Sequence, residues 1–185
     1  MHAHVHQPSP WIARFAHLVR AGGTVLDVAA GSGRHARLFA ARGCRVVAVD
    51  RDAGALDSLR GEQNVTCETA DLENGGWPFT RRQFDALVVT NYLHRPLLPH
   101  LAASLAPDGV LLYETFAAGN GRYGRPSNPD FLLGPAELLD VFAPVTTVVA
   151  FEQGDVQGAA PAVVQRLAAV GRGRPWPPVL VSSGG

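Results

Sequence analysis

The chain has 185 residues, 16 basic and 16 acidic side chains, and no formal net charge at neutral pH. This charge balance does not indicate an extended nucleic-acid partner, because neutralising many phosphates needs an excess of basic side chains. No apolar run approaches the roughly 20 residues that span a bilayer, and the start of the chain lacks a signal-peptide pattern. We expect a cytoplasmic protein that does not enter membranes and keeps its two cysteines reduced.

The first residues alternate histidine with other residue types. His2, His4 and His6 resemble a metal-binding tract, but no acidic or cysteine partner stands nearby. We therefore predict a flexible tail over residues 1–9, no metal site, and a single domain over residues 10–185. From residue 10 to 19 the apolar residues recur at helical spacing, and Ser9 is placed to cap this helix.

The next segment predicts a β-α-β unit. Two apolar runs, residues 24–28 and 45–50, are typical of buried parallel strands, and residues 34–42 between them have helical spacing. Because parallel strands end at the same edge of a sheet, Asp27 and Asp50 are expected to lie near one another there.

Between the first strand and the helix runs a glycine loop. Gly31 and Gly33 allow the backbone to approach a ligand closely. Residues 31–36 fit the G-x-G-x-x-A pattern of dinucleotide-binding proteins, with Asp50 at roughly the expected distance. However, a carboxylate at Asp27 would repel the pyrophosphate of such a ligand, whereas it would attract a cationic one.

These residues resemble the cofactor half of class I S-adenosylmethionine (SAM) dependent methyltransferases. In that family the first acid lies by the methionine moiety, the glycine loop packs against the cofactor, and the second acid accepts hydrogen bonds from the ribose hydroxyls. Ala29 stands where the family usually has its first glycine, and it is a small, tolerated variant. The cofactor contacts that the resemblance implies are Asp27, Ala29, Gly31, Gly33, Asp50, Arg51, Asp71, Leu72 and Asn91.

Strands and helices continue to alternate downstream. Helices are predicted over residues 52–60, 96–105 and 132–142, and strands over residues 65–69, 84–90, 110–116, 145–151 and 162–170, with a turn at residues 107–109. The resemblance implies an α/β, Rossmann-like three-layer sandwich. Its seven-stranded sheet has the order 3-2-1-4-5-7-6 with strand 7 antiparallel, which nicotinamide-dependent dehydrogenases generally lack.

The chemistry of the reaction is expected at the turn after the fourth strand. Residues 91–96 lack the two prolines of the Asn/Asp-Pro-Pro-Tyr turn of base-methylating relatives, so that activity loses support. His94 is either a general base or a packing residue, and Tyr92 is a wall or a hydrogen-bond donor. The catalytic candidates are therefore His94 and Tyr92, and the predicted acceptor contacts are Tyr92, His94, Arg95, Asn120, Tyr123 and Arg125.

Within the family, the chain is most similar to small bacterial methyltransferases of the tellurite-resistance type. The resemblance implies a SAM-dependent methyltransferase that modifies a small-molecule acceptor at an oxygen, nitrogen, sulfur or chalcogen atom. Two alternatives stay open: a SAM-binding module without catalysis, and an NAD-dependent oxidoreductase, which Asp27 disfavours.

Overall fold

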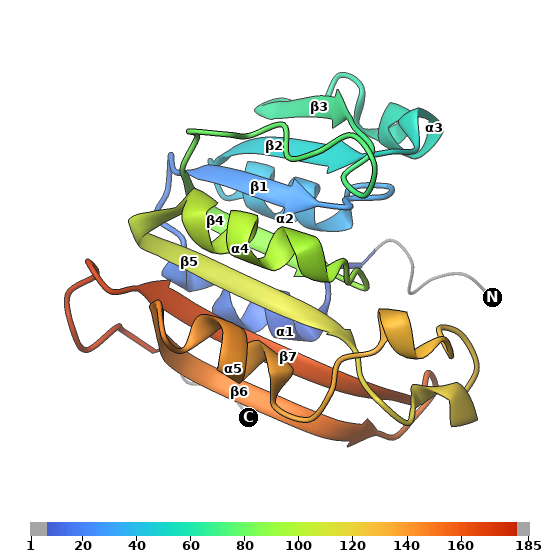
Figure 1. The fold of residues 1–185 in the computed structure, drawn as a ribbon. Coiled ribbons are helices and arrows are strands. Elements are labelled where there is room, and N and C mark those ends of the chain that lie inside the picture. Colours follow the sequence, from blue (N-terminus) through green and yellow to red (C-terminus); the bar gives the residue numbers. More distant parts are fainter. Residues whose placement is uncertain (1–6, 181–185) are drawn as a thin grey trace.

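The computed structural model describes residues 7–180, so the histidines at positions 2, 4 and 6 lie outside the described residues. Figure 1 shows one twisted sheet covered by helices on both faces. Its strands are β1 (Thr24–Val28), β2 (Arg45–Asp50), β3 (Val65–Thr69), β4 (Phe84–Thr90), β5 (Leu105–Phe116), β6 (Thr146–Val156) and β7 (Ala162–Gly171). The α-helices are α1 (Pro10–Phe15), α2 (Arg34–Ala41), α3 (Ala53–Leu56), α4 (Leu98–Ser104) and α5 (Glu137–Phe142).

The strand order is β3-β2-β1-β4-β5-β7-β6. The first five strands pair in parallel, and β7 runs antiparallel to both β5 and β6. The predicted α/β three-layer sandwich and its strand order are therefore confirmed. The carboxyl ends of the parallel strands meet at one edge of the sheet, on the right in Figure 1, which is where ligands bind in open α/β sheets.

Alternate residues of each strand feed two separate cores. Val25 packs on the side of α1 and α2, and Leu26 packs on the side of α4 and α5. Such double coverage explains why the parallel strands read as continuous apolar runs.

The helix before the first strand begins as predicted. The Ser9 hydroxyl accepts hydrogen bonds from the N–H groups of Trp11 and Ile12, and Pro10 occupies the first turn. Trp11, Ile12 and Phe15 are at most 4% exposed, so this face packs in the core. The α-helix ends earlier than predicted, at Phe15, and continues as a short 3-10 helix over Ala16–Leu18.

Other predicted boundaries are also wrong. The helix over residues 132–142 begins only at Glu137, because Ala136 has a left-handed φ of 58° that a regular helix cannot include. Residues 107–109 do not form a separate turn but belong to β5, at a register shift against β4. Strand β6 extends five residues further than expected, to Val156.

Among residues 7–180, no helix is long and apolar enough to cross a membrane. Both cysteines are free; Cys44 is buried in the core, whereas Cys67 lies exposed on the edge strand β3 and is not a core residue.

Candidate active site

A cavity of about 230 Å³ opens at the carboxyl ends of β1 to β4. It is lined by Ala29, Asp50, Arg51, Ala70, Asp71, Leu72, Glu73 and Tyr92. Five of the predicted cofactor residues and the catalytic candidate Tyr92 are thus brought together at one place. Ala70 and Glu73, which flank Asp71 and Leu72 in the same loop, complete the lining.

The glycine loop borders this cavity with strained backbone. Gly31 has a φ of 54°, and a Cβ added there would meet no atom within 4 Å. Ala29 and Asn91 also have left-handed φ values, of 52° and 54°, although both carry side chains. Strained residues of this kind concentrate at functional sites. The open space over Gly31 is what close approach of a ligand to the loop requires.

Gly33 has a different role in the same loop. A Cβ at this residue would lie 2.4 Å from two carbon atoms of Leu59, a side chain that is only 1% exposed. Gly33 therefore allows α2 to pack against Leu59, and it supports the loop without lining the cavity.

Asp50 fixes the loop from the end of β2. Its Oδ2 accepts a hydrogen bond of 2.8 Å from the N–H of Gly31, and its Oδ1 accepts one of 2.9 Å from the N–H of Asp52. Each carboxylate oxygen keeps capacity for a further donor. The carboxylate can therefore brace the loop and still bind the hydroxyl groups of a ligand.

Asp27 is the most unusual group of the site. It is 1% exposed, and neither carboxylate oxygen has a hydrogen-bond partner. Burial raises the pKa of this carboxyl to about 7. The Ala36 N–H and the charge of Arg34 offset part of the rise, but neither forms a hydrogen bond with good geometry to the carboxylate. A buried acid without a partner is costly when ionised, and a cation placed beside it would stabilise it.

Replacing Asp27 should change how stability depends on pH. Because the folded pKa of about 7 lies above the ordinary value of 3.8, the folded chain retains a proton that the unfolded chain has lost. The free energy of unfolding should then fall as the pH rises from about 4 to 7, by at most about 1.4 kcal/mol per pH unit. In ligand-free protein, Asp27→Asn should remove this fall in denaturant titrations.

Asp85→Asn serves as the control for this experiment. The Asp85 carboxylate accepts two hydrogen bonds from Thr24 and forms an ion pair with Arg20. Removing its charge should therefore destabilise the protein at neutral pH. A pH profile of Asp27→Asn identical to that of the wild type would show that Asp27 is ionised throughout.

The loop after β3 holds Asp71 in place. Asp71 Oδ1 accepts hydrogen bonds from the backbone N–H groups of Glu73 and Asn74, and Oδ2 accepts one from the Asn74 side chain. The hydrogen bonds from the Asn74 side chain and backbone, with the one from Glu73, lower the pKa of this carboxyl. Asp71 thus caps its own loop while it lines the cavity, and Leu72 behind it is buried.

His35 was not predicted from the sequence. It is 1% exposed; its Nε2 accepts the N–H of Ser9 at 3.1 Å, and its Nδ1 lies 3.3 Å from the Thr90 hydroxyl. Burial lowers the pKa of His35 to about 3, so the ring is neutral, and with Nε2 accepting it must carry its proton on Nδ1. It therefore ties the cap of α1 to the end of β4. A lone histidine in a helix gives no sequence signal of such a link.

The turn after β4 places Tyr92 against the cavity. Tyr92 is half-buried, and burial, with smaller effects of Glu73 and Asp71, raises its pKa to about 12. Its phenol is therefore protonated at neutral pH and can donate a hydrogen bond but not act as a base. The buried Tyr113 hydroxyl donates a hydrogen bond of 3.0 Å to the Tyr92 carbonyl and fixes the turn. His94, two residues on, is half-buried and does not line this cavity.

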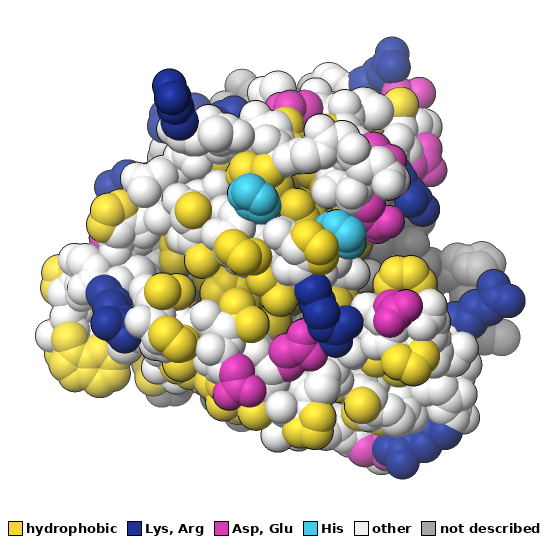
Figure 2. Space-filling model, viewed as in Figure 1, with side chains coloured by type: hydrophobic (Ala, Val, Ile, Leu, Met, Phe, Trp, Pro, Cys, Tyr) yellow, Lys and Arg dark blue, Asp and Glu magenta, His cyan; other side chains and the backbone are white. Residues whose placement is uncertain are grey.

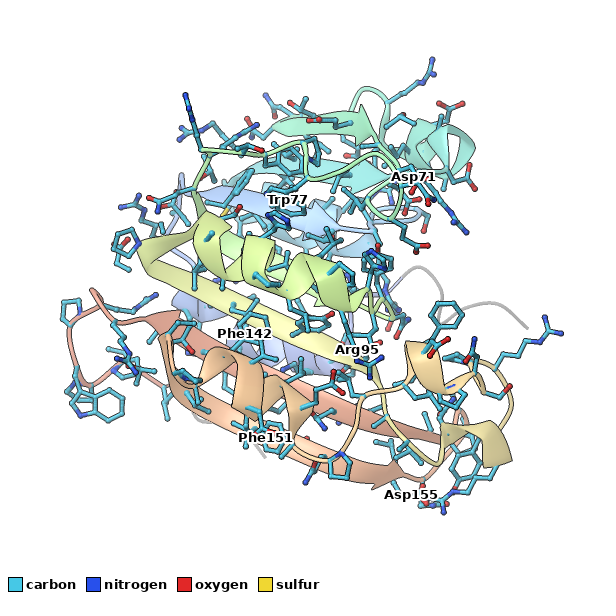
Figure 3. The ribbon with its side chains drawn as sticks, viewed as in Figure 1. Asp71, Trp77, Arg95, Phe142, Phe151 and Asp155 are labelled. Carbon is cyan, nitrogen blue, oxygen red and sulfur yellow. The ribbon has the colours of Figure 1, made fainter. Side chains whose placement is uncertain are left out.

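The other predicted acceptor residues do not line this cavity. Asn120 is buried, and its side chain bonds the carbonyl of Pro126 and the N–H of Val163. The hydroxyl of Tyr123 donates to Asp155, and Arg125 is exposed. Figure 3 shows Asp71 and Asp155 far apart at the carboxyl edge.

Arg95 links the turn to the loop that precedes α5. It forms a two-pronged ion pair with Glu137 (2.7 and 2.9 Å) and donates to the carbonyls of Asp130 and Leu132 (2.9 Å each). Figure 3 shows Arg95 beside this segment. The sequence places Arg95 and Glu137 more than forty residues apart and gives no signal that they pair.

Breaking this pair should have a pH-dependent cost. The hydrogen bonds of Arg95 lower the pKa of Glu137 below its ordinary value of 4.5. The pair therefore stabilises the fold above about pH 4.5, and this contribution is lost as the pH falls through the lower folded pKa. In denaturant titrations, Glu137→Gln should be less stable than the wild type at pH 7, and the two should converge in acid. Asp140→Asn, exposed on the same helix, should show little difference, and a gap that persists in acid would rule out the ion pair as its cause.

Comparison with known proteins agrees with this geometry. Residues 25–109 match the model of the methyltransferase domain family. A search of curated proteins returns no match. Among solved structures, TehB from Haemophilus influenzae superposes with a TM-score of 0.71 at 14% identity, over 86% of this chain and 61% of TehB. The chain thus spans less than two thirds of that relative.

Two further structures are similar over most of their length. A TehB-like SAM-dependent methyltransferase from Corynebacterium glutamicum has a TM-score of 0.64 and 18% identity, with 91% of both chains covered. The N-methyltransferase NodS from Bradyrhizobium japonicum, in complex with S-adenosylhomocysteine, has a TM-score of 0.62 and 17% identity, with 85% of this chain and 82% of NodS covered. The fold is that of class I SAM-dependent methyltransferases. The family match over residues 25–109 and this shared fold agree with the predicted resemblance, and the likeness to TehB and to the TehB-like protein is one of fold.

Proposed function

We propose that this protein is a methyltransferase that takes the methyl group from SAM and transfers it to a small-molecule acceptor. One observation carries the proposal: the Asp27 carboxyl is buried without a partner at the carboxyl edge, beside a glycine loop that leaves room for a ligand. SAM, when bound, supplies an electrophilic methyl group on a sulfonium and also carries an ammonium group. A cation of this kind stabilises an acid that the protein leaves unpaired.

The residues that would hold SAM surround the first cavity. We propose that Asp50 accepts hydrogen bonds from the ribose hydroxyls, and that Asp71 and Leu72 contact the adenine. The main chain of Gly31 and Ala29 would lie against the ligand, and Arg51 and Asn91 would border it. A dinucleotide fits this site less well, since its pyrophosphate would meet the Asp27 carboxylate when that group is ionised.

Methyl transfer from a sulfonium depends mainly on alignment of the nucleophile with the methyl group. Tyr92, which keeps its proton, is suited to orient the acceptor by a hydrogen bond. His94 follows on the same turn, and we propose it as the base that accepts a proton from the acceptor. The sequence also predicts acceptor contacts at four further residues: Arg95, Asn120, Tyr123 and Arg125. The internal bonds of Arg95, Asn120 and Tyr123 suit them better to holding the acceptor loop in shape.

Isothermal titration with SAM and with S-adenosylhomocysteine tests the proposal. We expect one site for each, and no binding of NADH that competes with them. NADH binding that SAM cannot displace would support an oxidoreductase instead. A protein that binds SAM but methylates none of a panel of thiols, phenols, amines and carboxylates would favour a non-catalytic SAM-binding module. The match of residues 25–109 to the methyltransferase domain family does not by itself distinguish such a module from an enzyme.

A further inference from the structure

A second, larger cavity is lined by Arg95, the last residue of the Asn91–Arg95 turn. It has a volume of about 540 Å³ and is formed by Arg95, Glu137 and the loop between β5 and α5. This volume is within the usual range of small-molecule sites, about 300 to 1,000 Å³. Arg95 stands three residues after Tyr92, which lines the first cavity. The two cavities therefore border the same turn, with Tyr92 lining the first and Arg95 the second, and His94 lies between these two residues in the sequence.

The wall of this second cavity is mainly apolar. Ala118, Pro129 and Leu132 line it together with three glycines, and Ser127 adds one hydroxyl. The loop is held in shape by the buried Asn120 side chain, which bonds Pro126 and Val163. The cavity is therefore formed before any ligand binds, so binding need not order the loop.

The charged groups of the cavity are already paired. Arg95 donates four hydrogen bonds, two to Glu137 and two to backbone carbonyls, and an arginine has five N–H donors. Arg122 forms an ion pair with Asp155. Figure 2, which views the face of α4 and α5, shows basic and acidic side chains next to one another at its centre, with no field of one sign. An ionic ligand would lose water without gaining a free counter-charge, which is unfavourable.

We propose that this second cavity binds the methyl acceptor, and that the acceptor is an uncharged, mainly apolar small molecule with one hydroxyl, amino or thiol group. The inference rests on the proposed function and adds the chemical class of the substrate. It disfavours oxyanions, including those of chalcogens. Arg125, the exposed arginine predicted to contact an anionic acceptor, does not line the cavity.

Three probes of the same size and different charge test the proposal: p-cresol, 4-methylbenzoate and 4-methylbenzylamine. Saturation-transfer NMR on the protein loaded with S-adenosylhomocysteine measures their affinities. We expect p-cresol to bind at least about ten-fold more tightly than either ion, which corresponds to about 1.4 kcal/mol. Binding of p-cresol weaker than about 10 mM, or equal binding of the benzoate, would overturn the proposal.

Variants locate the binding. Ser127→Trp and Ala118→Phe each fill the cavity from a different side and should abolish the p-cresol signal, whereas Asp140→Trp, exposed on α5, should preserve it. Unfolding titrations identify a cavity-filling variant that fails to fold. In that case the result of the other cavity-filling variant decides whether p-cresol binds in this cavity. A preference for 4-methylbenzoate that disappears in Arg125→Ala would instead place an anionic acceptor at that arginine.

The same samples separate this inference from the proposed function. Titration with S-adenosylhomocysteine reports on the first cavity alone. If it binds and p-cresol does not, only the acceptor class is wrong. If p-cresol binds in the second cavity and S-adenosylhomocysteine does not bind at all, the assignment of the first cavity fails.

Discussion

Asp50→Ala should weaken SAM binding roughly ten-fold to a hundred-fold, because a charge-assisted contact to the ribose hydroxyls is worth about 1.5 to 3 kcal/mol. Part of the loss would arise within the protein, since the N–H of Gly31 loses the acceptor that braces the loop. The measurement is calorimetric titration with SAM and S-adenosylhomocysteine, which share the ribose and should lose affinity equally.

Asp52→Ala is the matched control for this prediction. Asp52 stands two residues away and caps α3 through the N–H of Ala55, but it does not line the cavity. Its loss should lower stability by about 1 kcal/mol and leave SAM affinity within a few fold. If Asp50→Ala binds SAM as the wild type does, the ribose contact lies elsewhere and the assignment of the first cavity is wrong.

The sheet could be predicted because its signals are local. Apolar runs of strand length, a glycine loop and acids at strand ends occupy neighbouring positions from residue 24 to 50, and together they define the first cavity before any long-range contact is known. The last strand is predicted by its apolar run, and its antiparallel place in the sheet by the family resemblance; the pairing of β7 with β5 and β6 confirms both.

The acceptor side could not be predicted with the same detail, because its contacts join distant parts of the chain. Asn120 and Tyr123 are polar loop residues of the kind that binds ligands, yet their partners Val163 and Asp155 lie on another hairpin. The start of α5 depends on the left-handed backbone of Ala136, a conformation that its residue type does not indicate. Sequence patterns therefore locate the loop but not the partners of its side chains.

The two glycines of the loop should respond in opposite ways to the same substitution. At Gly31, the Cβ of a valine would enter open space beside the first cavity, where we place the ligand. At Gly33, it would overlap the buried Leu59. Gly31→Val should therefore reduce SAM affinity by more than about a hundred-fold in a protein that still unfolds cooperatively. Gly33→Val should mainly lower the free energy of unfolding, by about 1 to 3 kcal/mol from overpacking beyond the backbone strain.

Gly61→Val separates strain from obstruction. Gly61 has a φ of 83° and, like Gly31, no atom within 4 Å of an added Cβ. Unlike Gly31, whose N–H bonds the cavity-lining Asp50, it has no contact with a residue of the first cavity among the hydrogen bonds of the described residues. Both substitutions strain a left-handed backbone by a similar amount, about 1 to 2 kcal/mol, so their unfolding titrations should be alike. Only Gly31→Val should lose the calorimetric signal of SAM. Equal affinities in the two variants would mean that the space over Gly31 is empty in the complex, and the loop would then be an ordinary turn, because close approach of the ligand is what its glycine is expected to permit.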